Sequence, residues 1–176
     1  MKASSRPAGT AAPATTPSAA ARFVKALETK FPPVAQFLLF AAGMWLVAKY
    51  VPSLAFDMPF RRALVVLLFC LSALAAIPAI AAFHSAGTTV DPRYPGKATQ
   101  LVVRGVYRYS RNPMYLGLLV LLIAWAIYLS NLLGFVGPAA FVLSMNRLQI
   151  IPEEEAMEAR FGDEYRAYRE KVRRWI

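Results

Sequence analysis

The chain has 176 residues, of which 57% are hydrophobic, and its formal net charge is +10. This apolar fraction exceeds the roughly 45–50% of soluble domains and is concentrated in long runs. A soluble nucleic-acid-binding module is therefore excluded, and we attribute the basic charge to the surface of a lipid bilayer. With one cysteine and one histidine, the sequence predicts no disulfide framework and no metal site.

Residues 1–22 are dominated by Ala, Pro, Thr and Ser and carry too little apolar surface to offset the entropy lost on ordering. They lack the continuous apolar run of a secretory signal. The absence of acidic residues before Glu28 weakly resembles an organellar transit peptide, which is the alternative to a disordered cytoplasmic tail. One domain is expected over residues 23–176.

Four apolar segments follow, over residues 34–51, 63–83, 114–130 and 132–148. The first two have the roughly 17–25 residues that a transmembrane helix needs, and the last two are at the short end of that range. We predict an all-α integral membrane bundle of about four transmembrane helices, with residues 114–148 forming a tight hairpin around Ser130-Asn131. A partly re-entrant hairpin is the alternative. Cys70, inside the second segment, is expected to be a small buried side chain.

Lysine and arginine residues mark one side of this bundle. They are frequent in the N-terminal segment, in the connection between the second and third helices and from Arg147 onward, whereas the Ser130-Asn131 turn has none. By the positive-inside rule, both termini and the arginine-rich loop are cytoplasmic in a multi-pass protein of the inner or plasma membrane. Arg61 and Arg62 oppose this orientation.

The C-terminal segment has its own periodicity. Met157, Phe161, Tyr165, Tyr168 and Val172 recur at helical spacing on one face, and charged residues fill the other faces. Gly162-Asp163 is expected to divide this helix. The pattern predicts an interfacial helix, or a helix pair, that lies on the bilayer or covers the cytoplasmic end of the bundle.

Two polar clusters bracket the hairpin. Residues 101–117 (LVVRGVYRYSRNPMYLG) form an arginine- and tyrosine-rich loop, and Pro152 is followed by Glu153, Glu154 and Glu155. Carboxylates close to a membrane are a functional hypothesis by default. Acidic residues after a proline are also typical of an ordinary helix start, and spacing alone does not separate the two interpretations. For His84, a hydrogen-bonded interfacial role is favoured over that of a catalytic base.

The compound pattern of LVxxGxYxxxRNPxYxG, a hydrophobic hairpin, paired glutamates and FGxxYxxY resembles the isoprenylcysteine carboxyl methyltransferase family, which is grouped with the membrane phospholipid N-methyltransferases. The resemblance covers residues 84–176 and implies S-adenosylmethionine as cosubstrate. Two positions depart from the eukaryotic pattern. Asn112 stands where that pattern has histidine, and Gln149 stands where it has an arginine, for which Arg147 is a candidate substitute.

When the family's site residues are carried over by position, the resemblance implies one cosubstrate site. This site would be formed by the arginine loop, the start of the third helix and the glutamates. The backbone of the segment from Thr99 to Val102 would contact the cosubstrate, Tyr107 would line the adenosine pocket and Glu153, backed by Glu154, would receive charged or hydroxyl groups. The full implied set is Thr99, Gln100, Leu101, Val102, Tyr107, Asn112, Pro113, Met114, Tyr115, Glu153 and Glu154. Arg147 and Glu154 are the candidate catalytic residues.

The resemblance thus implies a membrane methyltransferase whose acceptor is lipophilic. A carboxylate acceptor is favoured over an amine, because it is already ionised and needs no base. We expect it to enter sideways from the bilayer along a route lined by Gly117. A nicotinamide-dependent reductase of the sterol reductase type and a non-enzymatic lipid-binding protein are the alternatives.

Overall fold

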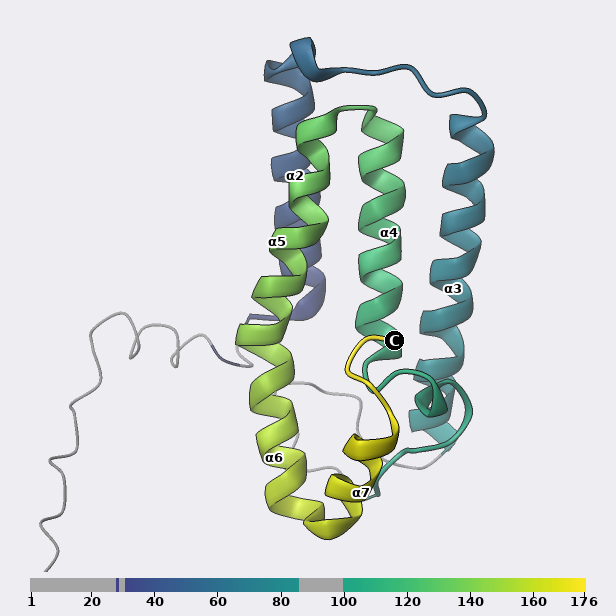
Figure 1. Cartoon of the computed structure of the whole chain (residues 1–176), viewed down its shortest axis with the longest axis vertical. Coiled ribbons are helices and arrows are strands. Elements are labelled where there is room, and N and C mark those ends of the chain that lie inside the picture. Colours follow the sequence, from purple (N-terminus) through teal and green to yellow (C-terminus); the bar gives the residue numbers. More distant parts are fainter. Residues whose placement is uncertain (1–27, 29–30, 86–99) are drawn as a thin grey trace, which may run out of the picture.

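The computed structural model describes Glu28, residues 31–85 and residues 100–176. Within this part, long helices lie side by side, and an isolated bridge between Ala55 and Asn131 is all the β-structure that forms (Figure 1). The all-α prediction is therefore confirmed for the described residues. The predicted tail over residues 1–22 lies outside them.

Three of the long helices follow the predicted segments closely. They are α2 (Pro33–Tyr50), α3 (Arg61–Ser85) and α4 (Pro113–Leu129), with the short 3-10 turns Pro52–Leu54, Gly105–Arg108 and Leu132–Phe135 in the connections between elements. Both α2 and α4 begin with a proline, because a residue in the first turn has no intrahelical use for an N–H group.

The fourth helical stretch is longer than predicted. It consists of α5 (Val136–Met145), a π-helical turn (Asn146–Ile150) and α6 (Ile151–Phe161), which follow one another without a break. Its predicted end at Leu148 is wrong. Pro152 has no N–H to donate, and the wider π-helical turn lies just before it.

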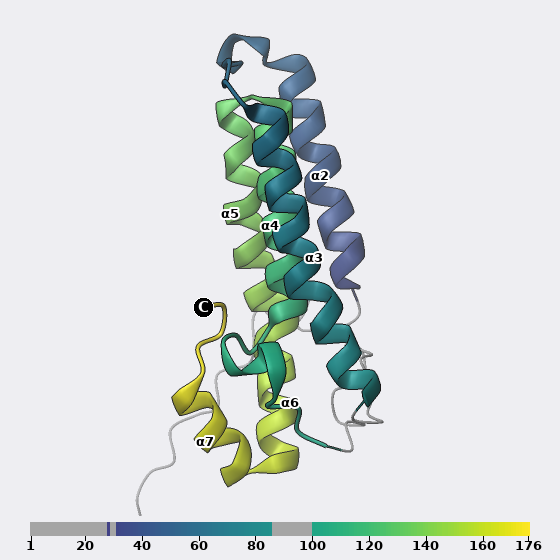
Figure 2. The same cartoon turned by 90° about the vertical axis from the view of Figure 1, so that its right-hand side faces the viewer.

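A final short helix, α7 (Asp163–Lys171), turns back against the end of the bundle (Figures 1 and 2). The chain reverses at Gly162, whose φ of 53° is a conformation that favours glycine. The predicted division of the C-terminal helix at Gly162-Asp163 is therefore confirmed.

Much apolar surface remains exposed on the outer helices. Among the described residues, Pro33–Tyr50 and Arg61–Ala82 are long and apolar enough to cross a membrane, and Pro113–Leu129 is a shorter apolar helix. Leu39, Val66 and Leu74 are each about 60% or more exposed, which in a bilayer places them against lipid. The four-span topology and its orientation stay predictions.

Cys70 belongs to this exposed surface. It is a free, exposed thiol on α3, so the prediction that it is buried is wrong. The error has a physical cause, because a helix that is apolar on all sides has no periodicity to distinguish its lipid-facing from its protein-facing residues.

α3 and α4 approach each other closely at Gly117. The Ser72 hydroxyl donates a hydrogen bond to the Gly117 carbonyl over 2.8 Å, and a Cβ atom on Gly117 would lie 2.9 Å from that of Ala76. Small residues of this kind let membrane helices pack backbone to backbone. Gly117 therefore belongs to the α3–α4 contact, and its expected place on an acceptor route is wrong.

At the end of the bundle remote from α6 and α7, polar groups satisfy one another. Arg61 donates to the Ser130 hydroxyl over 2.6 Å, and the Asn131 amide donates to the Val51 carbonyl over 2.8 Å. Arg61, which opposed the predicted orientation, thus has a polar partner on the α4–α5 turn.

Candidate active site

The beginning of α4 meets the beginning of α6 at three polar side chains. The Tyr115 hydroxyl and the Gln149 amide each donate a hydrogen bond to Glu153 Oε1, both over 2.6 Å. Tyr115 and Gln149 are buried. Because both donors reach the same oxygen, neither occupies Oε2, and the carboxyl group is held in one orientation.

Burial dominates the electrostatics of Glu153. Burial, with a smaller contribution from the neighbouring Glu154, raises the pKa of this carboxyl from 4.5 to about 7, although the hydrogen bonds from Gln149 and Tyr115 lower the pKa. The group therefore titrates near neutral pH. A cation placed beside it would favour the ionised form.

The π-helical turn explains how Gln149 and Glu153 reach Tyr115 together. The Ile151 N–H bonds to the Asn146 carbonyl, five residues back. This wider turn shifts the register of α6 relative to α5, and π-turns of this kind are frequent at functional sites.

The ordinary helix start considered for the glutamates does not occur here. Ile150, the residue before α6, has helical dihedral angles (φ −70°, ψ −46°), and the π-turn precedes it without interruption. No free helix end is therefore available for Glu153 and Glu154 to stabilise through its dipole.

Glu154 has an environment different from that of Glu153. Its carboxylate accepts from Arg111 over 2.8 Å and from Arg174 over 3.0 and 2.6 Å. The side chains of Glu154 and Arg111 are only 11% and 9% exposed. Adjacent glutamates thus have separate surroundings, one with neutral donors and one with two arginines.

The arginine loop contributes further residues to this end of the bundle. Tyr107 is buried, and its backbone carbonyl accepts from the Tyr168 hydroxyl over 2.7 Å. Leu101 and Val102 are half-buried and Gln100 is exposed, whereas Thr99 lies outside the described residues.

At the start of α4, Pro113 is buried and Met114 packs against the core cluster. The Asn112 amide donates to the Arg174 carbonyl over 3.0 Å.

Two further candidates are Arg147 and His84. Arg147 is about half exposed and pairs with Glu28 over 2.8 Å; its role as a substitute for the arginine at the position of Gln149 stays a prediction. His84 is exposed in the last turn of α3.

The predicted set of site residues lacked Arg111 and Gln149, although both lie in the motifs that carry the resemblance or beside them. It also lacked Arg174 and Trp175, which follow the end of the helical periodicity. Arg174 binds Glu154, and the Trp175 indole donates to the Asn146 side chain over 3.1 Å.

Residues 60–164, more than half of the chain, match the family described as phospholipid methyltransferase. The chain belongs to this family. The matched range includes α3, the arginine loop, α4, α5 and α6, and therefore both glutamates. The phospholipid methyltransferase match ends before Arg174 and Trp175.

Two relatives match parts of the chain. An uncharacterized protein of Haemophilus influenzae is 51% identical over 63 residues, which are 36% of this chain and the whole of that protein. The protein-S-isoprenylcysteine O-methyltransferase of Schizosaccharomyces pombe is 38% identical over 76 residues, which are 41% of this chain and 30% of that enzyme. No solved structure matches. Together these matches support a membrane methyltransferase of the phospholipid methyltransferase family.

Proposed function

We propose that this protein is a membrane methyltransferase that uses S-adenosylmethionine and methylates a lipophilic acceptor. The observation that carries the proposal is the carboxyl group of Glu153, held by Tyr115 and Gln149 at the junction of α4 and α6. S-adenosylmethionine would supply a methyl group on a positively charged sulfonium. The chemistry of the site fits such a ligand, since a carboxyl with a pKa of about 7 is readily ionised by a neighbouring cation.

The residues of the site have separate roles in this proposal. Glu153 binds the cationic cosubstrate, and Tyr115 and Gln149 orient its carboxylate. Tyr107, Asn112, Pro113 and Met114 form the wall of the same pocket, as the family resemblance implies. Methyl transfer is a displacement for which positioning and exclusion of water supply most of the acceleration, so the site needs few reactive side chains.

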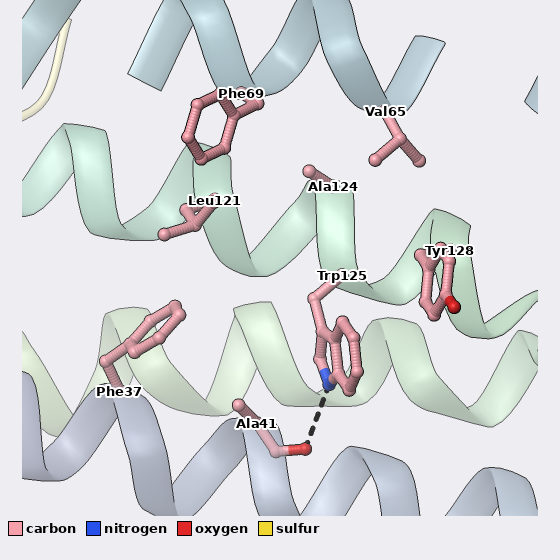
Figure 3. Close-up of a pocket in the computed structure, with 8 residues that line it drawn as sticks. All are labelled: Phe37, Ala41, Val65, Phe69, Leu121, Ala124, Trp125 and Tyr128. Atoms are coloured by element: carbon pink, nitrogen blue, oxygen red, sulfur yellow. Dashed lines mark hydrogen bonds between the residues drawn. The ribbon is translucent and has the colours of Figure 1, made fainter. Parts of the chain in front are cut away.

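An apolar groove supports a lipophilic acceptor. It has a volume of about 390 Å³ and lies between α2, α3 and α4 (Figure 3). The lining residues are Phe37, Ala41, Val65, Phe69, Leu121, Ala124, Trp125 and Tyr128. The indole N–H of Trp125 is bonded to the Ala41 carbonyl over 3.0 Å, so this wall presents mainly hydrocarbon to an occupant.

The groove lies along the helix that begins at the site. Leu121 is six residues beyond Tyr115 and Tyr128 is thirteen, which are roughly 9 and 20 Å along α4. The groove-lining residues of α4 lie on a different face of this helix from Tyr115. We propose that the hydrocarbon chain of the acceptor lies in this groove and that its polar end passes around the start of α4 to the junction of α4 and α6. A carboxylate at that end needs no base, and we propose it as the methylated group.

Titration of the purified protein in lipid nanodiscs tests the function. S-adenosylmethionine and S-adenosylhomocysteine should bind competitively, and NADPH should not bind. Binding of NADPH without S-adenosylmethionine would instead support a reductase, and binding of neither would support a lipid-binding protein without catalysis. Incubation with labelled S-adenosylmethionine and long-chain carboxylic or amino lipids then distinguishes O-methylation from N-methylation.

A further inference from the structure

The segment after α7, residues 172–176, folds back onto the beginning of α4 (Figures 1 and 2). Its backbone is extended at Val172, which is buried. The Arg111 N–H donates to the Arg173 carbonyl over 3.0 Å, and the Asn112 side chain donates to the Arg174 carbonyl over 3.0 Å. Two consecutive residues of the arginine loop are therefore bonded to two consecutive residues of the C-terminal segment.

A largely buried charge cluster reinforces these bonds. Arg174 donates through Nε and a terminal nitrogen to the two oxygens of Glu154, which is the strong two-point geometry of an arginine–carboxylate pair. Arg111 binds Glu154 Oε1 from the other side and also donates to the Arg169 carbonyl, in α7, over 3.2 Å. Removing Glu154 would leave both arginines without their carboxylate, whereas removing Arg174 leaves Arg111 as the remaining partner of Glu154.

The cluster holds together the two helix starts that supply the candidate site. Arg111 lies just before α4, the helix of Tyr115, and Glu154 follows Glu153 in α6. A third bond ties the same segment to the π-turn that carries Gln149, since the Trp175 indole donates to Asn146, the first residue of that turn. Tyr115, Gln149 and Glu153 therefore each lie within a few positions of a residue that is bonded to the C-terminal segment.

We propose that Arg174 is a positioning residue for cosubstrate binding, which acts through Glu154 to keep Tyr115 and Gln149 in register with Glu153. This inference rests on the proposed function. It also assigns the two glutamates different tasks: Glu153 binds the cosubstrate, and Glu154 anchors the arginines and does not touch the ligand.

The test compares Arg174→Ala, Arg174→Lys and Asn131→Ala in nanodiscs. Asn131→Ala is the matched control, because it also removes a buried hydrogen bond but at the opposite end of the bundle. S-adenosylmethionine affinity should fall about tenfold or more in Arg174→Ala, because Tyr115 and Gln149 would no longer hold the Glu153 carboxyl in its binding position. Arg174→Lys keeps the charge and should recover part of the affinity, and Asn131→Ala should lose stability without losing affinity.

The outcomes separate this proposal from the proposed function. Wild-type affinity in Arg174→Ala, with only a lower melting temperature, would show that the cluster is purely structural. Failure of the wild type to bind S-adenosylmethionine would refute the proposed function instead. In that case amide hydrogen exchange tests whether Arg174 holds these residues in place. Faster exchange at residues 111–116 and 149–154 in Arg174→Ala, but not in Asn131→Ala, would support this positioning role. Unchanged exchange at these residues would overturn it.

Discussion

Tyr115 and Glu153 are 38 positions apart in the sequence, yet the tyrosine hydroxyl lies 2.6 Å from the glutamate carboxylate. This bond joins the first turn of α4 to the first turn of α6. Tyr115 also belongs to the hydrophobic core cluster, so the residue that orients the carboxyl is itself fixed by packing. The candidate site and the interior of the bundle are therefore one packed unit at this end.

Replacing Glu153 by glutamine keeps the size of the side chain but removes its ability to become negatively charged. We expect S-adenosylmethionine to bind roughly 10- to 100-fold more weakly, because a charge-assisted bond contributes about 1.5–3 kcal/mol. The variant should remain monodisperse with a melting temperature at least equal to that of the wild type. Isothermal titration at pH 8 measures the affinity; an unchanged value would refute the assignment of Glu153 as a ligand.

The raised pKa of Glu153 predicts a pH dependence of stability. Because the folded state holds this proton more tightly than the unfolded state, the contribution of Glu153 is complete below pH 4.5 and is lost as the pH rises through about 7. The shift corresponds to about 3 kcal/mol. Thermal unfolding of the ligand-free protein across this range should show the loss, and Glu153→Gln should lack that component. Cosubstrate binding, in contrast, should tighten over the same range, since a cation favours the ionised carboxyl.

The α3–α4 contact predicts that alanine substitutions at two glycines differ greatly in their effect on the stability of the bundle. Gly117→Ala brings a Cβ to 2.9 Å from that of Ala76 and to 3.1 Å from the Ser72 carbonyl, whereas a Cβ at Gly134 meets nothing within 4 Å. We expect Gly117→Ala to destabilise the bundle by about 1–3 kcal/mol and Gly134→Ala to be close to neutral. Unfolding of both variants in detergent, followed by circular dichroism, compares them directly. Equal stability of the two variants would contradict the close approach.

If the groove holds the hydrocarbon chain of the acceptor, filling the groove should affect long-chain acceptors more than short ones. Ala41→Phe should fill the groove, whereas Ala42→Phe adds the same ring to the exposed surface of α2. Each buried methylene contributes about 0.8 kcal/mol, so Ala41→Phe should raise the KM for long-chain acceptors more than for short ones and leave S-adenosylmethionine affinity unchanged. The Ala42→Phe variant should behave as the wild type. An equal effect of Ala41→Phe on short and long acceptors would refute the groove as the site of the chain.

The four-span topology predicts which exposed positions share a side of the membrane. Single cysteines at Ser53 and Leu132, in a Cys70→Ala background, should be labelled by a membrane-impermeant maleimide from the outer side. A cysteine at Glu164 should be labelled only from the cytoplasmic side. Labelling of positions 132 and 164 from the same face would establish the re-entrant hairpin instead.

The helices of the bundle were predictable because long apolar runs and flanking prolines define them locally. α2 and α4 begin within one residue of the predicted positions, at Pro33 and Pro113. The π-turn was not predictable, because Pro152 is compatible both with the start of a new helix and with a distorted continuous one.

The junction of the two polar clusters was predictable in outline, since the family resemblance already joined Tyr115 and the glutamates. The separate environments of Glu153 and Glu154 were not. They arise from Arg111 and from Arg174, and the latter reaches Glu154 only because the chain reverses at Gly162 and passes back over the start of α4. Contacts that depend on such a reversal leave no periodic signal in the sequence.

The ion pairs of Arg111 also determine when the site can assemble during translation. Its carboxylate partner Glu154 is synthesised 43 residues later, and Arg174 a further 20 residues after that. While the ribosome is still making α5, Arg111 has neither of them, and water or lipid phosphate must solvate its charge. If Arg174 has the positioning role proposed above, the geometry around Glu153 is complete only after Arg174 has emerged from the ribosome.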